Sequence, residues 1–332
     1  MTVVDSPPGV ATRPAPPGGA FGPVAGAVAP GTAPTAPRKP RRISPGGQVV
    51  SSFITILSVT LLGFSLYVGF GSRLHHARAQ FEAYADFRQE LATATAPVGQ
   101  FQPADPDHPN APPTLLKPGA AVAVLTIPEL HLKEVVFEGT AGAVLENGPG
   151  HLRDTPLPGQ AGTSEIMGRA TLYGGPFARI GTLAQGDTFT VTTGQGVQRY
   201  TVLGVRDAGD DLPPPPAPGA GRLVLVTATG NPFVPSGVVR VDADQTSPVQ
   251  PSPPRPLGEA QLPRSELPMA TDPSAWVALV LFGQALVIAT GLVSWARVRW
   301  GPWQTWLVGV PVLSFFGLAV ADEAVRLLPN LM

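Results

Sequence analysis

The stretch that decides the fold is RLVLVTATGNPF, residues 222–233. Apolar and β-branched residues run without interruption from Leu223 to Thr227, which is the pattern of a strand buried on both faces. Ala228 closes this run, and Thr229 and Gly230 then lead into a turn. The function depends on why an alanine stands at the end of this strand.

Composition excludes several classes of protein. The net charge of -1 gives no electrostatic reason to expect nucleic-acid binding. The absence of cysteine excludes disulfides, thiolate metal sites and a thiol nucleophile. None of the 5 histidines forms an HExxH or similar ligand pair, so we expect no metal site and no cofactor. The 41 Pro and 38 Gly among 332 residues indicate that a good part of the chain is not packed core.

Three stretches predict transmembrane helices, at 48–70, 274–296 and 303–321. The first carries no charge over about 22 residues, long enough to cross a hydrocarbon core. The alternative, a cleaved signal peptide, is disfavoured because the run is too long and lacks an A-x-A site. Tryptophans cluster around the short link between the second and third stretches, which therefore form a helical hairpin.

Basic residues predict the orientation of these helices. They precede the first span at 38–42 and lie in the hairpin link at 297–299, and both groups fit a cytoplasmic side. Arg73 and Arg78, just beyond the first span, argue the other way. We expect a multi-pass protein of the cytoplasmic membrane, with residues 71–274 outside the cell.

The remaining segments differ in composition. We expect a disordered, Pro/Ala-rich cytoplasmic tail at 1–47, an extracellular helix at 71–97, linkers at 98–119 and 245–273, and a folded domain at 120–244. Within the folded domain, short strand-like runs alternate with Gly and Pro turns, with little helix. This pattern favours a small closed, or nearly closed, β-barrel.

A series of short motifs crosses the folded domain. In chain order they are LTIP at 125–128, VFEGT at 136–140, GPGH at 148–151, PGQAG at 158–162, YGGPF at 173–177 and LVT at 225–227. Their order resembles the sortase family, membrane-anchored cysteine transpeptidases of Gram-positive bacteria, and most of all its actinobacterial class E. The resemblance implies a mainly β fold: a sortase-like eight-stranded β-barrel ectodomain with one N-terminal and two C-terminal transmembrane helices.

The sequence departs from the family at its catalytic positions. Sortases carry Gly-His-Arg before the Tyr-Gly-x-Pro-Phe stretch, and here Arg169 stands at the histidine position. They carry Thr-Cys at the end of the penultimate strand, and here Ala228 stands at the cysteine position. The family's oxyanion arginine would fall near 237–238 in the closest alignment, and Arg240 is the nearest candidate. The resemblance therefore implies a degenerate copy without the catalytic Cys and His.

The missing groups predict an inactive protein. Sortases attack a peptide carbonyl with a thiolate and protonate the leaving amine with the histidine. A methyl group cannot attack, and an arginine does not shuttle protons near neutral pH. The alternative is an active transpeptidase or peptidase with a non-cysteine nucleophile such as Thr229, for which we find no base. By the resemblance, His151 is a loop residue and Glu165 and Asp154 are solvated loop charges near the cleft.

We expect the cleft to keep a binding role. Arg169, Thr227, Thr229 and His151 are the candidate binding residues, for an acidic or peptide ligand. The expected partner is a surface-protein sorting peptide or another membrane or cell-wall protein. Two alternatives stay open: Arg169 pairs with a local acid such as Glu165 and only fills space, or the barrel is a structural ectodomain.

Overall fold

The computed structural model describes residues 45–102, 114–232, 234–255 and 257–332. Nearly all of the cytoplasmic tail predicted at 1–47 lies outside these residues, as does the middle of the linker predicted at 98–119.

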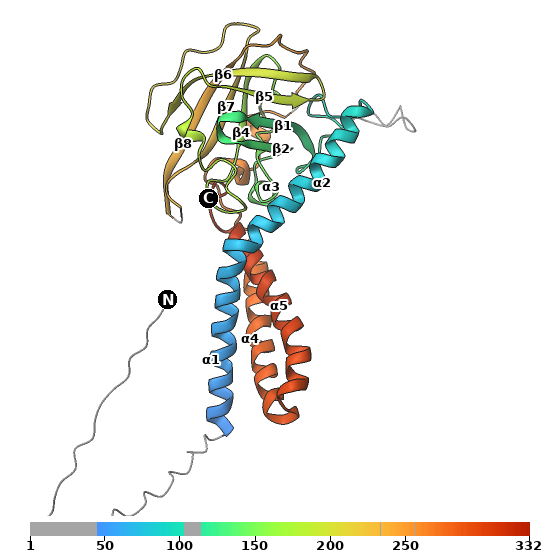
Figure 1. Cartoon of the computed structure of the whole chain (residues 1–332), viewed down its shortest axis with the longest axis vertical. Helices are drawn as coiled ribbons and strands as arrows, with labels where there is room; N and C mark the ends of the chain where they lie inside the picture. Colours follow the sequence, from blue (N-terminus) through green and yellow to red (C-terminus); the bar gives the residue numbers. More distant parts are fainter. Residues whose placement is uncertain (1–44, 103–113, 233, 256) are drawn as a thin grey trace, which may run out of the picture. The chain divides into compact units, whose positions relative to one another are not determined.

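Eight strands form one closed barrel, which confirms the predicted fold (Figure 1). Around the barrel their order is β1-β2-β3-β4-β7-β8-β6-β5, and β5 pairs with β1 to close it. The strands are β1 (Ala121–Ile127), β2 (Leu132–Glu138), β3 (Gly150–His151), β4 (Gly162–Met167), β5 (Thr188–Thr193), β6 (Gly196–Arg206), β7 (Gly221–Asn231) and β8 (Val234–Gln245). The barrel closes through β3 by a short contact, since β3 pairs only with Phe137 and Glu138 of β2 and with Ile166 and Met167 of β4.

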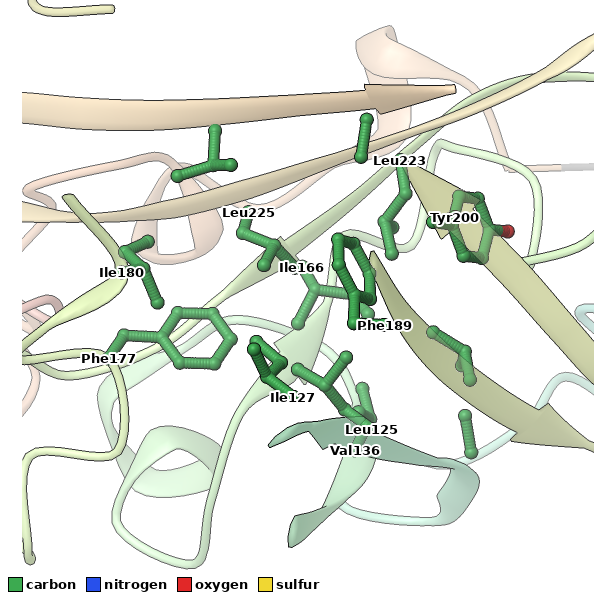
Figure 2. Close-up of a cluster of buried hydrophobic side chains, with 14 of the residues drawn as sticks. Leu125, Ile127, Val136, Ile166, Phe177, Ile180, Phe189, Tyr200, Leu223 and Leu225 are labelled. Atoms are coloured by element: carbon green, nitrogen blue, oxygen red, sulfur yellow. The ribbon is translucent and has the colours of Figure 1, made fainter. Parts of the chain in front are cut away.

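The barrel interior is filled by apolar side chains from every side of the sheet. Figure 2 shows Leu223 and Leu225 of β7 pointing toward Phe189 and Ile166 in this core. The alternate residues of β7, Val224 and Val226, pack on the outer face in a second cluster. Both faces of β7 are therefore buried, as the continuous apolar run predicts.

The decisive strand is longer than the sequence pattern predicts. β7 continues past Ala228 to Asn231 instead of ending there. Gly230 has a φ of 103°, and the pairing with β8 is irregular between Thr229 and Gly230. Glycine adopts this conformation without steric cost, so pairing resumes after the irregularity.

In the part of the chain that the structure describes, three helices are long and apolar enough to cross a membrane. The first is a continuous helix in which α1 (Pro45–Leu66) passes through a π-helical turn (Tyr67–Gly71) into α2 (Ser72–Ala92). The other two are α4 (Ala275–Trp300) and α5 (Pro302–Arg326). α1 packs beside α4 and α5 (Figure 1). Near the barrel lie one helical turn, α3 (Gly142–Leu145), and four 3-10 turns, Pro128–Leu130, Ile180–Thr182, Glu259–Gln261 and Arg264–Glu266.

The segments predicted as linkers lie against the barrel where the structure describes them. Gln100 is buried and its side-chain amide donates to the backbone oxygens of Arg153 and Leu257. Glu266 is buried and pairs with Arg153. Single buried polar anchors therefore hold these Pro-rich segments on the surface of the barrel, a feature that composition does not reveal.

Candidate functional site

Ala228 lies on the outer face of the barrel, where β7 pairs with β8. It stands opposite Val238, and its side chain is 8% exposed. It belongs to an apolar cluster that includes Met167, Val226 and Leu331. The only chemical group that this position presents is a methyl.

Arg169 follows β4 by two residues and is fully buried at 0% exposure. Its Nη2 donates to the Gly142 carbonyl at 3.0 Å, and its Nη1 donates to the Met332 backbone oxygen at 3.4 Å. The guanidinium also lies 5.0 Å from the centre of the Tyr173 ring, a cation–π distance. Arg169 is therefore a buried cation held by backbone oxygens and an aromatic ring.

The acid that pairs with Arg169 is Glu146, in place of the suggested Glu165. Arg169 Nη2 lies 4.0 Å from Glu146 Oε1. Burial lowers the pKa of Arg169, while Glu146 opposes that change, and an arginine keeps its charge under such conditions. Burial raises the pKa of Glu146 to about 7, although Arg169 acts in the opposite direction. The pair therefore carries a titratable carboxyl near neutral pH.

Arg240 shares the outer face with Ala228 but stands one cross-strand pair away. It lies opposite Val226, and Val238, two residues earlier on β8, lies opposite Ala228. Burial raises the pKa of Glu165, and the charge of Arg240 is the largest influence that lowers it. Glu165 is a half-buried residue of β4, so the expectation of a solvated loop charge is wrong for it.

His151 is a strand residue, and its assignment to a loop is wrong. It lies in β3, which pairs with both β2 and β4, and it is 1% exposed. Its Nδ1 lies 2.9 Å from Glu138 Oε2, and its Nε2 lies 2.9 Å from the Pro156 oxygen. Burial lowers the pKa of His151, but the charge and hydrogen bond of Glu138 outweigh it and the pKa is raised.

A cavity of about 470 Å³ opens at the end of β7. Thr227, Ala228 and Thr229 line it together with Asp207 and Met332. The Thr227 hydroxyl is occupied, because it donates to the Gly168 oxygen at 2.8 Å. No histidine is among the described residues that line the cavity, so the structure offers Thr229 no imidazole base there.

A segment that the sequence analysis did not assign to the site fills its other side. Residues Leu327–Met332, which follow α5 and are here called the tail, lie between the loop after β4 and the segment around 267–270. Leu331 is 0% exposed and contacts the cluster of Ala228. We call the channel that holds the tail the tail groove. Two of the predicted spans lie between the barrel and the tail, so the sequence predicts that the barrel and the tail lie on the same side of the membrane.

Candidate metal ligands do not gather in this site. No group of three His, Asp or Glu residues able to hold a metal ion occurs in the part of the chain that the structure describes.

Comparison with known proteins identifies the barrel. A family model described as the sortase domain matches residues 125–235. The barrel is a sortase domain. No curated protein matches the chain.

Several solved sortases resemble part of the chain. A sortase D5 transpeptidase of Clostridium perfringens is 20% identical with a TM-score of 0.40, covering 51% of this chain and 99% of that one. Sortase E1 of Streptomyces coelicolor, solved with a tripeptide in its active site, is 19% identical with a TM-score of 0.35, covering 39% and 90%. A C. perfringens sortase C with a C-terminal cell wall sorting motif is 20% identical with a TM-score of 0.36, covering 51% and 89%.

Within this sortase domain, the structure brings together only some of the predicted site residues. Thr227, Ala228 and Thr229 line one cavity. Arg169 donates a hydrogen bond to the backbone oxygen of Met332, which also lines that cavity. His151 and Arg240 do not line the cavity. The chain contains no cysteine at any position.

Proposed function

We propose that this protein is a catalytically inactive, class E-like sortase that binds a peptide and does not cleave it. One observation carries the proposal: the group that β7 presents at position 228, beside the cavity, is the methyl of Ala228, in a chain without cysteine. Acyl transfer through a covalent intermediate needs a nucleophile and a proton carrier. Arg169 stays charged and buried, so it supplies neither.

The walls around Ala228 suit an extended peptide. The Ala170 amide, in the loop after β4, donates to the Leu331 oxygen, and the Ala270 oxygen accepts from the Asn330 amide, so these two backbone groups already hold an extended segment of the chain. Between them lies an apolar floor that includes Met167 and Val226. Backbone partners along both edges and an apolar floor supply affinity without chemistry.

We infer that the sortase domain stands at the outer face of the cytoplasmic membrane, as its basic flanks predict. Three candidate membrane helices support an anchored protein. The partner in this proposal is a sorting peptide of a surface protein, or a segment of another membrane or cell-wall protein.

Covalent capture tests this function, because an introduced cysteine is unique in the chain. The reagent is a peptide with a cell-wall sorting motif that ends in a vinyl sulfone, applied to full-length Ala228→Cys in detergent micelles. The matched control is Leu212→Cys, in the connection between β6 and β7, where Leu212 is 77% exposed, compared with 8% at Ala228. A vinyl sulfone without peptide measures the intrinsic accessibility of each thiol.

We expect the peptide reagent to modify Ala228→Cys at least about tenfold faster than Leu212→Cys, because binding raises the local concentration of the reagent. The peptide-free reagent should show the opposite order. Equal or reversed rates with the peptide reagent would contradict peptide binding at this site. Cleavage of the unmodified peptide by the wild-type chain would restore the alternative, an active enzyme with a non-cysteine nucleophile.

A further inference from the structure

The tail is bound through its backbone like an added peptide. The Leu331 oxygen accepts from the Ala170 amide at 2.8 Å, and the Asn330 amide donates to the Ala270 oxygen at 2.8 Å. One edge of the tail therefore pairs with the loop after β4, and the other edge pairs with the Pro-rich segment. This is the hydrogen-bonding pattern by which proteins hold extended peptides.

Two tail side chains fill separate subsites. Leu331 lies at 0% exposure among the apolar side chains that surround Ala228. The Asn330 side-chain amide donates to the Thr140 oxygen at 2.9 Å and to the Leu267 oxygen at 3.0 Å. The first subsite selects an aliphatic side chain by burial, and the second selects a side-chain amide by its two donors.

The tail groove contains buried polar atoms whose hydrogen bonds are not made by the tail. Among the described residues, the buried Arg169 Nε and Asn330 Oδ1 have no hydrogen-bond partner. The groove adjoins the 470 Å³ cavity, because Met332 and Ala228 both line that cavity. The unpaired atoms and the adjoining cavity offer further contacts to another peptide.

We infer that the tail is a tethered, exchangeable ligand of the sortase groove, and that the groove binds extended peptides with Asn-Leu at the positions of Asn330 and Leu331. The inference rests on the proposed peptide-binding function and names its ligand. A partner peptide of this class displaces the tail and reaches the cavity beyond Met332. The tail therefore competes with a separate peptide and weakens the binding of that peptide to the groove.

The effective concentration of the tail determines how much it weakens the binding of a separate peptide. A ligand on a short tether acts at an effective concentration of about 1 mM. If the tail itself binds the open groove with a Kd of about 10 μM, any free peptide that competes with it binds the intact chain about a hundredfold more weakly. A weaker tail lowers this ratio, and at least about tenfold is expected.

The test uses a fluorescein-labelled peptide with the sequence of Leu327–Met332 and fluorescence anisotropy. Its partners are the full-length chain, a chain ending at Arg326, and full-length Leu331→Asp, whose tail is disfavoured in the apolar subsite. The control peptide carries the same Leu331→Asp change. Far-UV circular dichroism shows that each protein keeps its barrel, and Leu331→Asp serves alone if the shortened chain does not fold.

We expect both open-groove proteins to bind the peptide at least about tenfold more tightly than the full-length chain, and none to bind the control peptide. Equal affinity for all three proteins, or no binding to a folded open-groove protein, would overturn the inference. The vinyl sulfone capture at Ala228→Cys, repeated on the chain ending at Arg326, separates the two proposals. Capture at equal rates with and without the tail removes the tail inference alone, and no capture in either removes the proposed function too.

Discussion

At the scale of single residues, the proposed function depends on Ala228 and Arg169. Both positions could be singled out from the sequence because their neighbours keep motifs that resemble those of sortases. The partner of Arg169 could not be predicted. Glu146 and Gly142 reach it from α3, a helical turn that no periodicity in the sequence indicates.

Replacing Arg169 by methionine should destabilise the protein by about 3 kcal/mol, because a buried carboxyl and two backbone oxygens lose their cation. The matched control is Arg199→Met at an exposed position of β6, which should change stability by less than about 0.5 kcal/mol. The measurement is denaturant unfolding of the full-length chain in micelles. Similar values for the two variants would show that Arg169 only fills space.

The Glu146 carboxyl should make stability depend on pH. Its pKa rises from 4.5 to about 7 on folding, so the folded state favours the protonated form. Its contribution is fully present below pH 4.5 and is lost as the pH rises through about 7. The stability of Glu146→Gln relative to wild type should therefore increase between these pH values. The contribution of His151 to the pH dependence is present in both proteins and cancels in the difference between them. A difference in stability that does not change with pH would therefore contradict the burial of Glu146.

At the scale of elements, the strands follow from alternation and apolar runs, but their junctions do not. β3 is only Gly150–His151, too short for a sequence pattern, yet it joins β2 to β4 and buries His151. The extension of β7 past Ala228 depends on a glycine irregularity that forms only against β8. Short-range sequence signals therefore located the barrel and missed the contacts that shape its site.

A substitution at Gly150 tests how closely β3 packs between β2 and β4. A Cβ added there would meet the backbone carbonyl of Gly139, which cannot move without breaking the strand pairing. Gly150→Ala should cost at least about 2 kcal/mol by overpacking. Gly204→Ala in β6 is the control, because nothing lies within 4 Å of the added carbon and the change should be neutral or slightly stabilising. Thermal unfolding followed by circular dichroism compares them, and equal losses would refute this packing.

At the scale of the whole molecule, the candidate membrane helices α4 and α5 connect the barrel to the tail. The apolar runs predicted all three candidate helices because length and hydropathy are local properties. The packing of the tail against the Ala228 cluster could not be predicted, since it depends on where α5 directs Leu327–Met332. The sequence indicated only that the tail and the barrel share a side.

Orientation can be measured with single cysteines in this cysteine-free chain. A membrane-impermeant maleimide should label Leu212→Cys, in the connection between β6 and β7, on intact cells, and should label Arg299→Cys at the end of α4 only after the cells are opened. Both positions are exposed in the structure, so burial does not account for a difference. Labelling in the opposite order would place the sortase domain in the cytoplasm.

The central claim is that this sortase domain holds a peptide without cleaving it. Its most direct test is a mass-spectrometric time course of a sorting-motif peptide, mixed with the purified wild-type chain and an amine acceptor. The account predicts an intact peptide throughout, because loss of the nucleophile from such a site costs roughly 10⁶-fold in turnover. A cleaved or transferred product that appears with wild type and disappears with Thr229→Ala would contradict it.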